Sequence, residues 1–210
     1  NTVSEFGREL DSLADVISFG IAPGVLAFAW GVQFVDWSIL ADANVSVQLQ
    51  RATYFVTFLY LLCGASRLAR FNISVNPVPK NPGRADRKYF VGLPIPAAAG
   101  MVAAVIYALD SQPLQHWYAA VIWMGLIGLL AFLMVCTWRY RSFKDFNLLS
   151  PRSFKSVITL GSFIYLLFNF SQPVLLAMAS TYVASGIFVR IGGLIRRGSS
   201  HASKPEAQVG

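Results

Sequence analysis

The segment Gly7-Arg8-Glu9-Leu10-Asp11-Ser12-Leu13-Ala14-Asp15 runs directly into an apolar stretch that begins Val16-Ile17-Ser18-Phe19-Gly20. Gly7, Asp11 and Asp15 are four residues apart, so on a helix they share one face at intervals of about one turn. Two carboxylates in this relation repel each other, and an unpaired acid is costly at the edge of a membrane. A divalent cation between them would relieve both penalties, and Gly7 would leave room for a bulky ligand against the backbone. The segment therefore predicts a metal-assisted site at the start of a membrane-spanning helix.

The same residues also admit a plain structural interpretation. Acids in the first turn of a helix are favoured by the helix macrodipole, and Asp11 and Asp15 would then simply be solvated at the membrane surface. One glycine and two aspartates at this spacing form a loose pattern, so the spacing alone does not choose between the two interpretations.

The composition indicates a membrane protein with several spans. Of the 210 residues, 55% are hydrophobic and only 13% are charged, whereas about 25% of the residues in a typical soluble domain are charged. Cys63 and Cys136 lie in apolar runs without a CxxC motif, and His116 and His201 stand apart. None of these four residues therefore predicts a zinc site or a disulfide framework.

The apolar runs predict an all-α polytopic membrane protein with about six transmembrane helices. We expect helices at about residues 13–34, 52–68, 96–109, 117–138, 156–170 and 174–189. Residues 1–190 would then form one transmembrane domain, and residues 191–210 are expected to be a disordered tail. Tryptophans near the predicted helix ends are expected to be interfacial anchors, namely Trp30, Trp37, Trp117, Trp123 and Trp138.

The distribution of basic residues predicts the orientation of these helices. The chain has 17 Lys and Arg residues, and Arg51 is the single one in the gaps on the side opposite Asp11. Cytoplasmic loops carry such an excess of Lys and Arg, so we expect the Asp11 end and the tail to be cytoplasmic. The net charge of +7 then reflects topology and anionic headgroups, and we expect no nucleic-acid partner.

The residues around the aspartates resemble the second half of the CDP-alcohol phosphotransferase signature, D-x-x-D-G-x-x-A-R-x8-G-x3-D-x3-D. Gly7, Asp11 and Asp15 occupy its last three defined positions, and the run from Glu9 to Pro23 is similar to the phosphatidylserine synthase branch of that family. The first half of the signature would lie before Asn1. We therefore expect an N-terminally truncated sequence that lacks two metal-binding aspartates and the helix or helices that precede them.

The resemblance implies a helical bundle of the CDP-alcohol phosphotransferase type and a specific reaction. A phosphatidyl group would pass from CDP-diacylglycerol to L-serine, with release of CMP and assistance from Mg²⁺ or Mn²⁺. Asp11 would be a metal ligand, Asp15 both a metal ligand and the general base, and Gly7 would allow the cytidine diphosphate to approach. The resemblance further implies a homodimer in contact with membrane lipids, placed in a bacterial inner (cytoplasmic) membrane.

Two further segments resemble the same branch. In Cys63-Gly64-Ala65-Ser66-Arg67-Leu68-Ala69-Arg70-Phe71-Asn72 the resemblance implies that Arg67, Arg70 and Asn72 face the substrate pocket. The alternative is that these arginines reach for lipid headgroups, as terminal arginines often do. In the segment from Gly92 to Gly100, Gly92 and Pro94 would help to shape the amino-alcohol pocket, and the alternative there is close helix packing through small residues.

Two other functions compete with transfer to serine. Members of the same family use glycerol 3-phosphate, inositol phosphate or choline as acceptor. The similarity of three segments to the serine branch argues against these acceptors. A transporter with a cytoplasmic ion site would need polar residues near the middle of several spans. The central parts of the predicted spans are nearly all apolar, which argues against transport.

Overall fold

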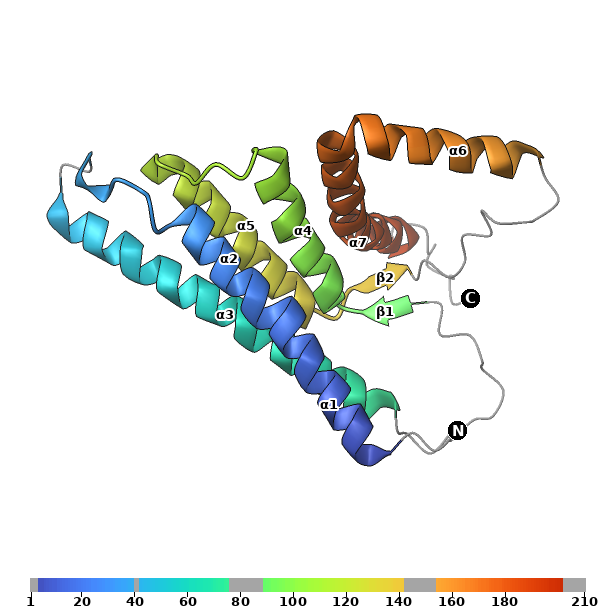
Figure 1. Ribbon diagram of the computed structural model, residues 1–210. Helices are drawn as coiled ribbons and strands as arrows, with labels where there is room; N and C mark the ends of the chain where they lie inside the picture. Colours follow the sequence, from blue (N-terminus) through green and yellow to red (C-terminus); the bar gives the residue numbers. More distant parts are fainter. Residues whose placement is uncertain (1–3, 40–41, 76–88, 142–153, 202–210) are drawn as a thin grey trace, which may run out of the picture.

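The computed structural model describes residues 4–39, 42–75, 89–141 and 154–201. Helix α1 (Glu5–Val16), the π-helical turn η1 (Ile17–Ile21) and α2 (Ala22–Gly31) follow one another without a break, and the long α3 runs back beside them (Figure 1). The remaining elements are the 3-10 turn η2 (Trp37–Ile39), α3 (Ala43–Val75), β1 (Tyr89–Val91), α4 (Ile95–Ala108), α5 (Trp117–Val135), β2 (Arg139–Arg141), α6 (Phe154–Asn169) and α7 (Ser171–His201).

The described residues form a predominantly helical membrane protein with three or four candidate spans. Three helices are long and apolar enough to cross a bilayer, namely Glu9–Gly31, Ala43–Arg70 and Trp117–Val135. The α6–α7 pair bends by 117° and gives at most one more. Helix α4 has 14 residues and spans about 21 Å, less than the hydrocarbon thickness of about 30 Å. The predicted count of about six is therefore not confirmed, because α4 is short and α6 and α7 meet at an angle.

A π-helical turn interrupts the first span, where the sequence predicted an uninterrupted helix. Pro23 lacks a backbone N–H, so the carbonyl of Phe19 cannot accept the usual bond from four residues further on. The hydroxyl of Tyr60 on α3 donates to that carbonyl at 3.3 Å, and Tyr60 is fully buried. The tyrosine hydroxyl thus satisfies a backbone group that the proline leaves open.

Helix α5 lies within the bundle, packed against α3 on one side and near α4 on the other (Figure 1). Trp123 of α5 is buried, and its indole N–H donates to the carbonyl of Ala27 at 2.9 Å. Its ring meets that of Trp30 edge-on at 5.0 Å between centroids. The prediction that Trp30 and Trp123 anchor the protein at the membrane interface is therefore wrong: both belong to the apolar core, together with Trp37.

The C-terminal helix is longer than expected. Helix α7 continues to His201, whereas the disordered tail was expected to begin at residue 191. The segment from Arg190 to Arg197 contains no proline and keeps apolar residues at helical spacing, which explains why the helix does not stop there. Helix α7 packs along α4 and against β2.

Candidate functional site

The predicted aspartates lie on the first helix, at the end of the bundle where α3 ends and β1 pairs with β2 (Figure 1). Ser4 caps α1 by accepting a hydrogen bond from the backbone N–H of Gly7 at 3.1 Å. Asp11 is exposed, whereas Asp15, one turn later on the same face, is half-buried. A Cβ built on Gly7 meets Ser4 Oγ at 3.2 Å and nothing else within 4 Å among the described residues. The backbone at Gly7 is thus open on the side facing away from its cap.

The end of α3 is held beside the aspartates by a side-chain hydrogen bond. The amide of Asn72 donates to the hydroxyl of Ser12 at 2.7 Å. Further along the crossing, a Cβ built on Gly20 would lie 3.1 Å from Leu61. The two helices therefore run antiparallel, and Asp15 lies in the stretch between these two contacts. Ser12 was not among the predicted site residues, although it lies directly beside Asp11.

The two predicted arginines of α3 have different surroundings. Arg70 is exposed, and its Nη1 donates to the carbonyl of Val135 at 3.1 Å, which closes the end of α5. Arg67 is half-buried, and its Nε is enclosed without a hydrogen-bond partner among the described residues. Arg70 thus has a structural contact, and Arg67 retains a donor for another acceptor.

Gly92 and Pro94 lie where β1 leads into α4, and the structure gives both a backbone role. Gly92 has a φ of +79°, and a Cβ there would lie 2.6 Å from the carbonyl oxygen of Met134. Its N–H donates to the carbonyl of Trp138 at 2.8 Å. Pro94 precedes the first turn of α4 and is its N-cap. The packing interpretation accounts for both residues.

Asp11 and Asp15 are the carboxylates predicted to hold a metal ion. Among the described ranges, no group of three or more His, Cys, Asp or Glu side chains is close enough to hold a cation. Magnesium is commonly bound by one or two carboxylates together with substrate phosphates and water. Asp11 and Asp15 fit that mode of binding, in which a diphosphate supplies further ligands.

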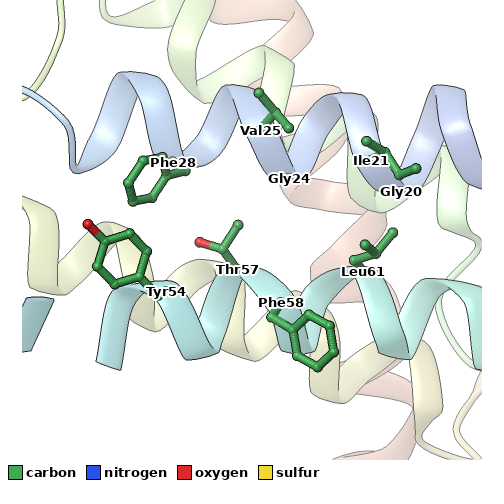
Figure 2. Close-up of a pocket in the computed structure, with 9 residues that line it drawn as sticks. All are labelled: Gly20, Ile21, Gly24, Val25, Phe28, Tyr54, Thr57, Phe58 and Leu61. Atoms are coloured by element: carbon green, nitrogen blue, oxygen red, sulfur yellow. The ribbon is translucent and has the colours of Figure 1, made fainter. Parts of the chain in front are cut away.

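An apolar groove of about 310 Å³ lies next to this region but contains neither aspartate. It opens between the η1–α2 segment and α3, as Figure 2 shows, with Thr57 in the middle and Leu61 near Gly20. Phe28 and Tyr54 stand together at the other end, with ring centroids 5.1 Å apart. The groove begins just beyond Asp15 along the same helix, and its lining offers apolar contacts and no charge.

The structure therefore brings together only some of the predicted residues. Asp15 and Arg67 both lie along the α1–α3 crossing, and Asn72 tethers that crossing.

Several known proteins are similar to this chain over part of its length. The family model for CDP-alcohol phosphatidyltransferases matches residues 1–133. A CDP-diacylglycerol–serine O-phosphatidyltransferase of Helicobacter pylori (strain J99) is 36% identical over 144 residues, covering 69% of this chain and 52% of that protein. The enzyme of the same name from Bacillus subtilis is 31% identical over 144 residues, covering 69% and 63%. An archaetidylserine synthase of Methanothermobacter thermautotrophicus is 36% identical over 99 residues, covering 47% and 32%. The chain spans about half the length of the Helicobacter relative.

Proposed function

This chain belongs to the CDP-alcohol phosphatidyltransferase family, and from that premise we propose that the complete protein transfers a phosphatidyl group from CDP-diacylglycerol to L-serine, releasing CMP. The observation that carries the proposal is the shared face of Asp11 and Asp15 on α1, with Arg67 and Asn72 of α3 along the same crossing. The relatives named as serine phosphatidyltransferases support serine as the acceptor.

In the proposed mechanism the protein positions two substrates and moves one proton. The half-buried carboxylate of Asp15 takes the proton from the serine hydroxyl as its oxygen attacks the phosphorus bound to diacylglycerol. The bond between that phosphorus and the bridging diphosphate oxygen breaks, and CMP leaves. A positioned general base of this kind contributes about 10²- to 10⁴-fold to the rate. Asp11, which is exposed, is assigned to the metal and not to the proton.

The proposed cofactor is a divalent cation, Mg²⁺ or Mn²⁺, held by Asp11 and Asp15. Such a cation neutralises charge that develops on the diphosphate. Gly7, one turn before Asp11, leaves the backbone accessible to the cytidine diphosphate. Arg67 and Asn72 of α3 are assigned to substrate binding. The other predicted residues, Arg70, Gly92 and Pro94, would support the site through the backbone contacts described above.

The proposed setting is a bacterial inner membrane, with the Asp11 end facing the cytoplasm. The distribution of basic residues supports this orientation. Membrane lipids and a second copy of the chain, in a homodimer, are the proposed partners. The exposed apolar side chains of α1 and α3, among them Leu13 and Phe58, offer surface for both.

The direct test uses membranes that contain the full-length protein, CDP-diacylglycerol and labelled serine. We expect label in phosphatidylserine and an equal amount of CMP, with both lost when EDTA removes the metal and restored by Mg²⁺ or Mn²⁺. Release of CMP with glycerol 3-phosphate, inositol phosphate or choline, but not with serine, would keep the chemistry and change the acceptor. No release with any acceptor would return Asp11 and Asp15 to the role of solvated acids at a helix start.

A further inference from the structure

The inward-facing side of the first span begins with Ser12 and contains Asp15. Along α1 and η1 the half-buried or buried positions are Ser12, Asp15, Val16, Phe19 and Gly20. These positions have the spacing of one helix face, and the residues between them are exposed. Asp15 therefore belongs both to this inward face and to the face that it shares with Gly7 and Asp11. Asp11 itself is exposed and lies outside the inward face.

Helix α3 packs against this face, and two close contacts fix how it lies there. At the start of the face, the amide of Asn72 donates to the hydroxyl of Ser12 at 2.7 Å. At its end, a Cβ added to Gly20 would lie 3.1 Å from Leu61. Asp15 lies between these contacts and three residues after Ser12, so the two side chains are neighbours on the helix surface. The distance of the Asp15 carboxylate from α3 therefore depends on both contacts.

The two contacts constrain the helix pair in different ways. The contact of Gly20 with Leu61 is apolar, and apolar contacts have no preferred direction. The inward face is apolar from Val16 onward up to this contact. A hydrogen bond, in contrast, weakens steeply when its length or angle changes. The bond between Ser12 and Asn72 is therefore the contact that fixes the rotation of α1 against α3 near Asp15.

We propose that the hydrogen bond between Ser12 and Asn72 holds Asp15 at its working distance from the substrates, so that Ser12 is a positioning residue. This inference rests on the proposed function, in which Asp15 takes the proton of the acceptor hydroxyl. A base must lie within hydrogen-bond reach, about 2.6–3.2 Å, of the group from which it removes the proton. A misplacement of about 1 Å can lower a rate by about 100-fold. Ser12 controls the rate in this way through the α1–α3 contact and needs no contact with either substrate.

The first experiment measures kcat and the KM for each substrate with full-length variants in membranes. We expect Ser12→Ala to lower kcat by about 10- to 100-fold, because Asp15 is no longer held in place. The unfolding temperature should stay nearly the same, because one hydrogen bond between helices adds little to the stability of a membrane protein. Ser12→Thr keeps the hydroxyl and should retain most of the activity. Ser18→Ala, at an exposed serine of η1, is the matched control and should leave every value unchanged.

Two double variants test whether Ser12 acts through Asn72 and on Asp15. In an Asn72→Ala protein, Ser12→Ala should have no further effect, because the hydrogen bond is already absent. In an Asp15→Asn protein, Ser12→Ala should leave the residual transfer unchanged, because no base remains to be positioned. A serine that only supports the fold would lower the rate by the same factor with and without Asp15.

Cross-linking tests the contact itself without a measurement of activity. In a protein without native cysteines, we expect a short bifunctional thiol reagent to join cysteines at positions 12 and 72. A pair at positions 18 and 72 is the control and should not be joined, because Ser18 lies on the exposed side of the span. Failure of the first pair to react would reject the contact and the inference with it.

Three kinetic results would also overturn the inference. A normal kcat for Ser12→Ala would show that the hydrogen bond does not position the base. A raised KM for serine with a normal kcat would assign Ser12 to substrate binding. Equal losses from Ser12→Ala in the wild-type and Asp15→Asn proteins would show that Ser12 only supports the fold. A wild-type protein that releases no CMP with any acceptor would instead reject the proposed function, and the inference with it.

Discussion

Asp11 and Asp15 are one helical turn apart, yet their surroundings differ enough to predict different roles. Asp15 is half-buried beside the α3 crossing, and Asp11 is exposed. We expect Asp15→Asn to lower turnover by about 10²- to 10⁴-fold, because an amide cannot accept the serine proton. Binding of CDP-diacylglycerol should persist, because Asp11 still holds the cation. Phosphatidylserine formation and equilibrium binding of labelled CDP-diacylglycerol measure the two effects separately.

The matched control for Asp15 is Asp36, an exposed aspartate beyond the far end of α2. Its carboxylate accepts hydrogen bonds from the backbone and hydroxyl of Ser38, and these bonds hold its pKa below the usual value. Asp36→Asn should therefore leave transfer unchanged. Full activity of the Asp15 variant would reject the base assignment.

Cys136, which follows the last residue of α5, provides a prediction about pH. Burial raises the pKa of its thiol, and the thiol donates to the carbonyl of Leu133 at 3.1 Å. Because the thiolate is the reactive form, a raised pKa lowers reactivity at pH 8. In a Cys63→Ala protein, we expect maleimide to label Cys136 more slowly at pH 8 than a cysteine introduced at exposed Ser38, and the gap to narrow as pH rises. Equal rates at pH 8 would contradict the burial of this thiol.

At the scale of an element, the hydroxyl of Tyr60 on α3 satisfies a backbone carbonyl of the π-helical turn η1. Tyr60→Phe would leave the Phe19 carbonyl without its donor in a buried setting, at a cost of about 1–3 kcal/mol. We expect a lower unfolding temperature for the detergent-solubilised protein, measured by intrinsic tryptophan fluorescence. Tyr54→Phe, at an exposed tyrosine six residues earlier on the same helix, is the control and should have little effect. An unchanged unfolding temperature for Tyr60→Phe would show that the carbonyl is satisfied in another way.

The packing of α2 against α5 makes a second prediction of this kind. A Cβ on Gly31 would lie 2.1 Å from the ring of Trp123, whereas a Cβ on Gly125 would meet nothing within 4 Å among the described residues. Gly31→Ala should cost about 1–3 kcal/mol, because the tryptophan must shift and strain its bond to Ala27. Gly125→Ala should be neutral or stabilising, since alanine favours a helix. Equal unfolding temperatures for the two variants would contradict this packing.

These elements show what the sequence can and cannot predict. The bounds of α4 and α5 were predicted within a few residues, because apolar runs between turn residues mark them clearly. The π-helical turn was not predicted, although Pro23 in the same span leaves the Phe19 carbonyl without its usual donor. The donor that replaces it, Tyr60, lies far away in the sequence. Trp30 and Trp123 were misassigned as interfacial anchors. The sequence alone does not show whether lipid or another helix covers an aromatic residue near a helix end.

At the scale of the whole molecule, the sequence predicts the family but not how the helices pack against one another. The resemblance in residues 7–15 predicted the family, and the family match confirms it. The site assignments themselves remain predictions. The position of α7 could not be predicted, because hydropathy gives a helix but not its partner. Tyr140 of β2 lies against α7 at Gly186, where a Cβ would come within 2.1 Å of its ring.

The orientation of the molecule in the membrane is the last prediction. In the predicted topology nearly all the basic residues lie on the same side of the membrane as Asp11, so we expect CMP and serine to be exchanged with the cytoplasm. In a protein without native cysteines, we expect a cysteine at Ser38 to react with a membrane-impermeant maleimide added to intact cells. A cysteine at Ser203, in the tail, should react only after the cells are opened. The reverse pattern would place Asp11 and Asp15 outside the cytoplasm, where the cytidine nucleotide is not supplied, and would contradict both the orientation and the proposed reaction.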